Sequence, residues 1–207
     1  MPFLYSTEYD YGVILRNFAR ERNIYLLFGA PGVEPAPGLS PDDYPLFNRA
    51  HLINPAGKDV GVYEKEHLVP FGEYPPSWIR LPFLDFFLGE VGDFTPGVRT
   101  APLRVNNADL GVLICYETIF PELSRKRVAQ GAAALVNISN DAWFGNTAAP
   151  EQHLQLTAMR AVEEGRYLVR ATNTGISSLV DPNGRILFRS ELFKAESIPV
   201  VIKMEDG

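Results

Sequence analysis

From residue 101 onward the chain alternates short apolar runs with helix-like segments, and this order constrains the fold more than any other feature. The runs typical of strands are "APLRV" (101–105), "ADLGVLIC" (108–115), "AAALVNIS" (132–139), "YLVRATN" (167–173), "GISSLVD" (175–181) and "ILFRS" (186–190). Between them, "PELSRKRVAQG" (121–131) and "PEQHLQLTAMRAVEEG" (150–165) are typical of helices. Interleaved strands and helices predict an α/β fold, and the closing run of strands predicts a mixed sheet that meanders at its end.

The first 65 residues continue this pattern. Apolar residues at helical spacing predict a helix from about Glu8 to Arg22. The apolar run "IYLLFGAP" (24–31) ends in Gly and Pro, as a buried strand does. Pro, Gly and Asp make 32–45 a surface loop, and 46–65 is expected to form two strands around a turn at Asn54–Gly57.

The stretch from Glu66 to Gly97 is irregular and rich in Pro and aromatic residues. A long segment with little regular structure inside a compact domain is usually either functional or disordered, and its apolar content argues against disorder. We therefore expect an ordered active-site loop with a short helix around Phe83–Leu88.

Composition narrows the class of protein. A length of 207 residues with 46% hydrophobic and 21% charged residues predicts one soluble-type globular domain over 1–207. The net charge of −6 and the lack of a Lys/Arg stripe argue against nucleic acid as a partner. One cysteine and scattered histidines predict neither a disulfide nor a metal site, and no cofactor is expected. The sequence contains no apolar run of 18 or more residues, which is the length needed to span a bilayer.

The single cysteine, Cys115, lies where a strand gives way to a helix that opens with Pro121 and Glu122. A strand-to-helix turn points its side chain into the cleft above a sheet, where backbone N–H groups can bind an oxyanion, and a cysteine there has a favoured thiolate. Without context, a lone cysteine is more often a buried structural thiol. Both interpretations stay open on this segment alone.

The segment "YEKEHLVPFGEYPP" (63–76) adds a lysine, Lys65, after a strand and an acid, Glu73, in the irregular stretch. A lysine and a carboxylate near a thiol would form a nucleophile, a cation and a base in one site. Taken singly, each is more typical of a solvated surface position.

Four segments together resemble the nitrilase-type (carbon–nitrogen hydrolase) domain of the apolipoprotein N-acyltransferases. In order they are "GVYEKEHLVPFGEYPP", "GVLICYETIFPE", "NISNDAWFG" and "QHLQLTAMRAVEEGRYLVRATNTGISSLVDPNGRI". The lysine loop with "HLVPFGEY" and the motif "NDAWFG" are particular to the acyltransferases, while the lysine and the cysteine turn are shared with other nitrilase relatives. The resemblance implies an α-β-β-α sandwich with mixed sheets.

The resemblance also implies an activity. Cys115 would take a fatty acyl group from a phospholipid as a thioester and pass it to the N-terminal amine of a diacylglyceryl-modified apolipoprotein. Lys65 and the backbone N–H of Tyr116 would stabilise the oxyanion. Glu73 would orient Lys65, and Glu117 would be a further required acid beside the nucleophile. The resemblance assigns the following residues to the cleft lining: Asn140, Asp141 and Trp143.

The sequence departs from the family at both ends. The nitrilase triad contains a Glu from a "W-P-E" motif that would precede Met1, so we expect this chain to lack the general base together with the first strand, helix and second strand. It also lacks the family's membrane helices, which would place the parent protein at the periplasmic face of the bacterial inner membrane. The isolated chain is therefore expected to be inactive.

Two alternatives remain. A soluble nitrilase-like amidase would hydrolyse a small C–N substrate, and a degenerate domain without the base would bind a partner without catalysis. The reactivity of the Cys115 thiol would separate catalytic from non-catalytic designs.

Overall fold

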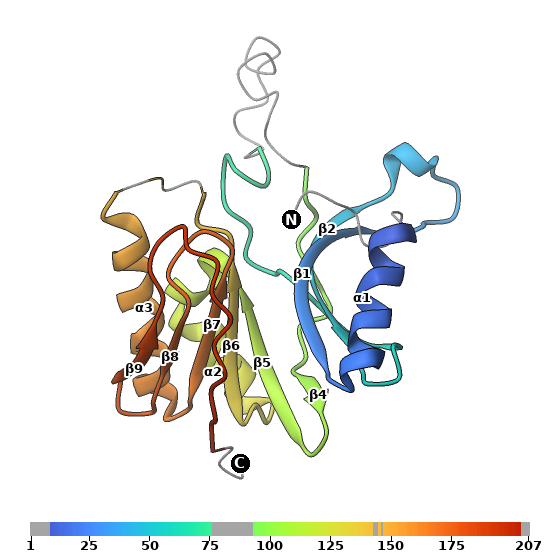
Figure 1. The fold of residues 1–207 in the computed structure, drawn as a ribbon. Helices are drawn as coiled ribbons and strands as arrows, with labels where there is room; N and C mark the ends of the chain where they lie inside the picture. The colour runs from blue at the N-terminus through green and yellow to red at the C-terminus, as the bar shows by residue number, and fades with distance from the viewer. Residues whose placement is uncertain (1–8, 76–92, 143–144, 146, 204–207) are drawn as a thin grey trace.

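The computed structural model describes residues 9–75, 93–142, 145 and 147–203, and it contains two β-sheets packed face to face (Figure 1). The first sheet has three antiparallel strands in the order β1-β2-β3. Its strands are β1 (Leu26–Val33), β2 (Leu46–Ile53) and β3 (Asp59–Glu64), preceded by helix α1 (Tyr9–Arg22). The loop between β1 and β2 carries one turn of 3-10 helix, η1 (Pro41–Asp43).

The second sheet has six strands in the order β4-β5-β6-β7-β8-β9. They are β4 (Leu103–Val105), β5 (Ala108–Ile114), β6 (Ala134–Ser139), β7 (Leu168–Thr172), β8 (Ser178–Val180) and β9 (Ile186–Arg189). The central strands β5, β6 and β7 run parallel, and the remaining pairs are antiparallel. The expectation of a mixed sheet with a terminal meander is confirmed.

Helices cover the outer face of each sheet. In Figure 1, α1 lies on the far side of β1 and β2, while α2 (Pro121–Ala129) and α3 (Ala149–Glu164) lie outside the six-stranded sheet. Pro121 and Pro150 stand in the first turns of their helices, where a missing N–H has no consequence. Helix α3 ends at Gly165 with φ 61°, a left-handed cap that glycine adopts without strain. The layers follow the predicted α-β-β-α order.

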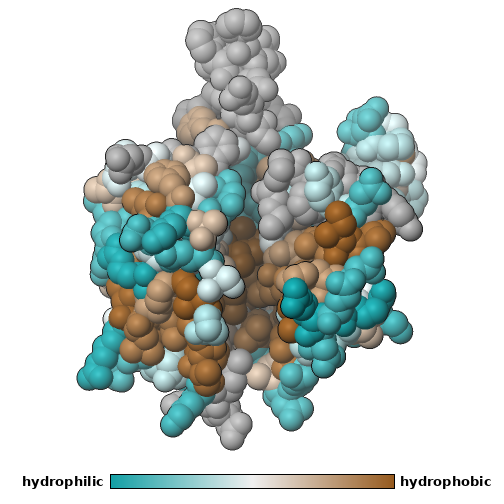
Figure 2. Space-filling view, viewed as in Figure 1, coloured by the Kyte–Doolittle hydropathy of each residue, from teal (hydrophilic) through white to brown (hydrophobic). Residues whose placement is uncertain are grey.

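Three apolar clusters hold these layers together. The central cluster lies between the sheets, and its buried members are Ala50, Leu52, Tyr63, Leu103, Val112 and Ile114. Figure 2 shows hydrophobic atoms gathered along this seam. Separate clusters pack α1 on the first sheet, through Ala19 and Phe28, and α3 on the second, through Ala158 and Leu168.

Most element boundaries agree with the sequence within two residues. The turn between β2 and β3 is stabilised by the Asn54 side chain, which accepts from the N–H groups of Ala56 and Lys58. Cys115 is not part of β5, because a short 3-10 helix, η3 (Cys115–Ile119), separates that strand from α2. Glu8 and the expected helix at Phe83–Leu88 lie outside the described residues. The single domain over 1–207 stays a prediction.

Candidate active site

Cys115 stands at the sharp turn between β5 and η3, partly buried against the inter-sheet cluster. Its φ is 51°, in the left-handed region that non-glycine residues seldom occupy. Such backbone conformations cost about 1–3 kcal/mol and persist only where the surroundings hold them. A strained strand-to-helix turn that presents a nucleophile is also the arrangement of the hydrolase nucleophile elbow.

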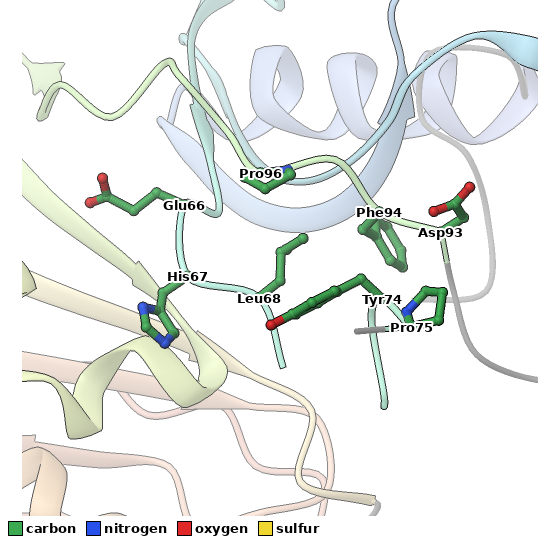
Figure 3. Close-up of a pocket in the computed structure, with 8 residues that line it drawn as sticks. All are labelled: Glu66, His67, Leu68, Tyr74, Pro75, Asp93, Phe94 and Pro96. Atoms are coloured by element: carbon green, nitrogen blue, oxygen red, sulfur yellow. The ribbon is translucent and has the colours of Figure 1, made fainter. Parts of the chain in front are cut away.

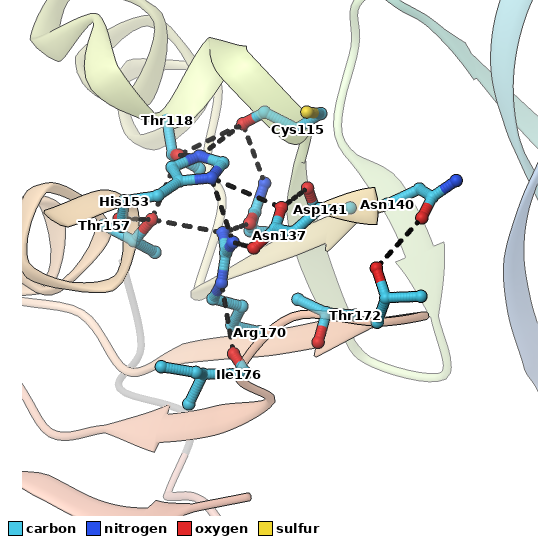
Figure 4. A network of polar contacts seen from close by, with 12 residues as sticks. Cys115, Thr118, Asn137, Asn140, Asp141, His153, Thr157, Arg170, Thr172 and Ile176 are labelled. Atoms are coloured by element: carbon cyan, nitrogen blue, oxygen red, sulfur yellow. Dashed lines mark hydrogen bonds and ion pairs between the residues drawn. The ribbon is translucent and has the colours of Figure 1, made fainter. Parts of the chain in front are cut away.

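The carbonyl oxygen of Cys115 is held by three side chains. Thr118 Oγ1 donates to it over 3.2 Å, Asn137 Nδ2 over 3.4 Å, and His153 Nε2 lies 3.2 Å away. All three side chains are buried. In Figure 4 the carbonyl points into this polar cluster, whereas the sulfur of Cys115 points out of it. These contacts therefore hold the Cys115 carbonyl in place on the buried side of the turn.

Arg170 on β7 lies at the centre of the same cluster. It donates to Asp141 Oδ2 over 2.7 Å and to the carbonyl of Ile176 over 3.2 Å, and it also bonds the Asn137 side chain. Its Nη2 lies 3.1 Å from His153 Nδ1. Burial opposes ionisation of Asp141, but hydrogen bonds from His153 and Ser139 and the charge of Arg170 outweigh it. The pKa of the Asp141 carboxyl is therefore lowered to about 2.

Lys65 and Glu73 form an ion pair on the side of the three-stranded sheet. Lys65 directly follows β3, its side chain is 1% exposed, and its Nζ lies 2.7 Å from Glu73 Oε2. Glu73 also accepts from the N–H of Val69 over 2.8 Å and from Asn48 Nδ2 over 2.7 Å. Because both carboxylate oxygens have fixed partners, the Lys65 ammonium has a fixed position.

Gly97 packs against the backbone of the segment that contains Lys65. Its N–H donates to the Lys65 carbonyl over 2.8 Å, and a Cβ at this position would lie 2.3 Å from Glu64 Cβ. Only glycine allows the backbone to approach β3 so closely.

Glu117 joins the lysine segment to the cysteine turn. One carboxylate oxygen accepts from the N–H groups of Glu66 and His67, over 2.8 and 3.1 Å. The other accepts from the Tyr63 hydroxyl over 2.8 Å and from the Ile114 N–H over 2.7 Å. Glu117 is fully buried, and this burial raises the pKa of its carboxyl. One side chain thus fixes the residues next to Lys65 and Cys115 relative to each other.

A pocket of about 360 Å³ adjoins the lysine segment (Figure 3). It lies between 66–68, 74–75 and 93–96, and its apolar walls include Leu68, Tyr74 and Phe94. His67 at its edge packs on Phe120, with ring centroids 3.9 Å apart, and Phe120 contacts Tyr116 edge-on. The volume is within the range of small-molecule sites.

The residues predicted for the cleft lining lie at different depths. The Asn140 side chain is partly exposed and points away from the Arg170 cluster in Figure 4. Asp141 is 1% exposed and bonded to Arg170 and Ser139. Trp143 lies outside the described residues. In the described part of the chain, no group of three or more His, Cys, Asp or Glu side chains is arranged for a metal ion.

Sequence reasoning did not identify the support beneath the cysteine. His153 is one of the scattered histidines of the sequence, and the structure places it against the Cys115 carbonyl. Arg170, Asn137 and Thr118 were not singled out at all. The available signal was an arginine inside the otherwise apolar strand "YLVRATN", since a buried charge requires a partner.

Comparison with known proteins agrees with this geometry. Residues 14–206 match the model of the carbon-nitrogen hydrolase family. The chain is 40% identical to the apolipoprotein N-acyltransferase of Geobacter metallireducens over 206 residues, covering 100% of the chain and 39% of that protein. It is 36% identical to the Pseudomonas aeruginosa enzyme of the same name, covering 97% of the chain and 39% of that protein.

Solved structures show the same fold. A carbon-nitrogen hydrolase from Helicobacter pylori G27 superposes with a TM-score of 0.68 at 19% identity, covering 90% of this chain and 64% of that one. An amidase from Nesterenkonia sp. AN1, with an acetamide moiety covalently added at its active-site cysteine, superposes with a TM-score of 0.62 at 27% identity, covering 87% and 62%.

The chain spans about 39% of the length of the curated relatives it matches. Among its described residues, no helix is both long and apolar enough to cross a bilayer. The family model covers nearly the whole chain, the α-β-β-α layers agree with it, and so the chain belongs to the carbon–nitrogen hydrolase family.

Proposed function

We propose that this chain carries the acyl-transfer site of an apolipoprotein N-acyltransferase, with Cys115 as the nucleophile. The observation that carries the proposal is the Glu117 carboxylate, which bonds the backbone beside Lys65 and the backbone beside Cys115 at once. It ties the segment that follows the buried Lys65 to the strained cysteine turn, and these two come from different sheets. The relatives named apolipoprotein N-acyltransferase support this assignment.

In the first half-reaction, the Cys115 thiolate attacks the ester carbonyl of a phospholipid. A C–S bond forms, the C–O bond to glycerol breaks, and the proton that the thiol lost on ionising is returned to the freed oxygen of the lysophospholipid. The Lys65 ammonium and the Tyr116 N–H stabilise the intermediate oxyanion. Each such donor is typically worth about 3–4 kcal/mol of barrier.

In the second half-reaction, the α-amine of the acceptor attacks the thioester. An N–C bond forms, the C–S bond breaks, the amine loses a proton, and the Cys115 thiolate returns. The acceptor is the diacylglyceryl-modified N-terminal cysteine of an apolipoprotein. A thioester intermediate suits this two-step reaction, because a thioester is far more reactive toward amines than the starting ester is.

Each remaining residue has a role defined by its position. Glu73 orients Lys65, and Glu117 holds the two halves of the site together. Asn140 lines the cleft, and Asp141 supports it from beneath, while the role that the resemblance implies for Trp143 stays a prediction. In the parent protein the site would face the periplasm at the bacterial inner membrane, and membrane helices outside this chain would bring the lipid to it.

The direct test is acyl transfer from p-nitrophenyl butyrate to the chain at about pH 9. At that pH an ordinary thiol is largely ionised, and nitrophenolate leaves without a proton, so the reaction needs no general base. Intact mass should show one butyryl group, mapped by peptide analysis to Cys115 and absent from Cys115→Ala. Acylation that survives in Cys115→Ala would refute the assignment.

A second comparison separates acyl transfer from the amidase alternative, which the likeness to the Nesterenkonia amidase favours. The full-length parent protein is offered a phospholipid with a labelled acyl chain in one reaction and butyramide in another. Thioester formation from the lipid supports the acyltransferase, whereas ammonia release from butyramide with an unreactive lipid supports an amidase.

A further inference from the structure

The buried cluster under Cys115 holds a backbone peptide group in place. The carbonyl held by Thr118, Asn137 and His153 belongs to the peptide that joins Cys115 to Tyr116. A trans peptide is planar, and its C=O and N–H point in opposite directions. Since the carbonyl points into the cluster, the Tyr116 N–H points out of it, toward the side on which the Cys115 sulfur lies (Figure 4).

We propose that Arg170, His153 and Thr118 are positioning residues for the oxyanion donor, acting by fixing the orientation of the 115–116 peptide. This inference rests on the proposed function, in which the Tyr116 N–H stabilises the tetrahedral intermediate. None of the three needs to contact the substrate. Their effect on the oxyanion donor reaches the reaction through the Cys115 carbonyl.

The direction of the hydrogen bonds at the Cys115 carbonyl follows from the carbonyl itself. A carbonyl oxygen can only accept, so His153 Nε2 is the donor in their 3.2 Å contact. On the other side of the ring, Nδ1 lies 3.1 Å from Arg170 Nη2 and 3.4 Å from Asp141 Oδ1.

Thr118 completes the arrangement. Its hydroxyl lies 3.1 Å from His153 Nε2 and donates to the Cys115 carbonyl over 3.2 Å. Hydrogen bonds from His153 and Thr118 therefore converge on the carbonyl, and Arg170 contacts the other side of the His153 ring. Such a network strengthens each of its members in a buried, low-dielectric setting.

The position of the cluster makes rearrangement difficult. Thr118 is 0%, Arg170 1% and His153 5% exposed, so water cannot replace a lost partner easily. Behind Arg170, a Cβ on Gly175 would lie 2.2 Å from Asp141 Oδ2, so the chain packs directly on the ion pair. The Cys115 carbonyl thus has a single available orientation.

Two reactions of the same thiol separate peptide positioning from other effects. Acylation by p-nitrophenyl butyrate passes through an oxyanion, while alkylation by iodoacetamide displaces iodide from carbon and forms none. Both rates are measured at about pH 9 in the whole chain. The ratio of acylation to alkylation reports the oxyanion donor, independently of how reactive or accessible the thiol is.

Matched variants keep or remove one donor at each position. His153→Leu and Thr118→Val remove a hydrogen-bond donor at similar volume, whereas His153→Gln and Thr118→Ser retain one. We expect the removing variants to acylate about 10–100-fold more slowly, since small misplacements of a catalytic group have effects of this size. Their alkylation should stay within about 2-fold of the wild type, and the retaining variants should recover most of the acylation rate.

Each result has a defined meaning. Unchanged acylation in Thr118→Val, the near-isosteric variant, would overturn the positioning role, and so would an equal loss of both reactions. If His153→Leu does not fold by circular dichroism, the threonine pair decides. A wild-type chain that alkylates at Cys115 but never acylates would refute the proposed function itself, which is a different outcome.

Discussion

Two carboxylates of the site differ in how they are stabilised. Asp141 faces a buried arginine and a histidine, and the pKa of its carboxyl is lowered to about 2. Glu117 accepts four hydrogen bonds but faces no arginine within the cluster, and burial raises the pKa of its carboxyl. Asp141 is an ionised partner of Arg170 beneath Cys115. Glu117 is fully buried and bonds two backbone segments to each other.

The Glu73 carboxylate offers a direct test at the residue scale. Glu73→Gln removes the negative charge that holds the Lys65 ammonium, so we expect acylation of Cys115 by an activated ester to fall about 10–100-fold. The matched control is Glu151→Gln, which removes an exposed carboxylate paired with Arg189. Equal rates in both variants would show that the buried pair does not assist the reaction.

Asp141 predicts a pH dependence of stability. A carboxyl whose pKa falls from 3.8 to about 2 on folding contributes roughly 2 kcal/mol at neutral pH. This contribution is complete above pH 3.8 and is lost as the pH falls through 2, because the unfolded chain takes up the proton first. Asp141→Asn should therefore be less stable than wild type by at least that amount at pH 7, since Arg170 also stays buried without its partner.

Urea unfolding of both proteins at pH 7 and at successive steps down to pH 3 measures this difference. The gap should be constant from pH 7 to about pH 5 and should narrow below pH 4. A gap that stays constant down to pH 3 would show that folding does not lower the pKa of the Asp141 carboxyl.

At the element scale, each sheet contributes through the ends of its strands. Lys65 follows β3 of the first sheet, and Cys115 follows β5 of the second. The parallel strands β5, β6 and β7 place Cys115, Asn140 and Asn173 at the same edge of their sheet, so loops far apart in sequence meet there. The support beneath Cys115 has a corresponding origin, since it combines α3, β6 and β7.

Strand β2 carries His51, a titratable residue that lies away from the site. His51 lies between α1 and the first sheet, stacked on Phe28 with its Nε2 3.3 Å from the Ala30 carbonyl. Burial lowers the pKa of His51 to about 4 from 6.5. The unfolded chain therefore binds the proton more readily, and native stability should decrease as the pH falls from 6.5 to 4.

His51→Gln keeps an amide donor near the Ala30 carbonyl but cannot take up a proton. We expect its free energy of unfolding to change less than that of wild type between pH 6.5 and 4, by about 3 kcal/mol. Denaturant unfolding at both pH values gives the two slopes. Parallel slopes would mean that His51 titrates normally in the native state.

At the scale of the whole molecule, the site exists only because the two sheets pack together. Leu52 of β2 is 1% exposed in the cluster that joins them. Removing buried methyl groups leaves a cavity, so Leu52→Ala should reduce the free energy of unfolding by about 2–5 kcal/mol. Leu156→Ala, on the outer face of α3 where the leucine is 39% exposed, is the matched control and should change stability by less than about 1 kcal/mol.

Urea unfolding of the two leucine variants provides the comparison. Equal stability changes would show that the inter-sheet cluster is not the part of the core on which the molecule depends. A cavity at Leu52 should also slow acylation of Cys115, because Lys65 and Cys115 come from the two sheets that this cluster joins.

The local sequence was sufficient for the elements and for the family. Apolar runs, prolines at helix starts and the glycine after α3 are local signals, and they predicted the strands, α2 and α3 nearly to their ends. The motifs around Lys65, Glu73, Cys115 and Glu117 predicted which residues to examine. These features depend on residues close together in the chain, so their physics can be read from the sequence.

Only the tertiary structure decided how these residues are supported. Three of the four bonds of Glu117 reach residues about 50 positions away. Arg170 reaches partners on strand β6, on helix α3 and in two loops. A buried polar group finds its partners by packing in three dimensions, and nothing in the local pattern names them. The sequence by itself determined the layers and the nucleophile candidate, whereas the fold determined the orientation of the peptide beside it.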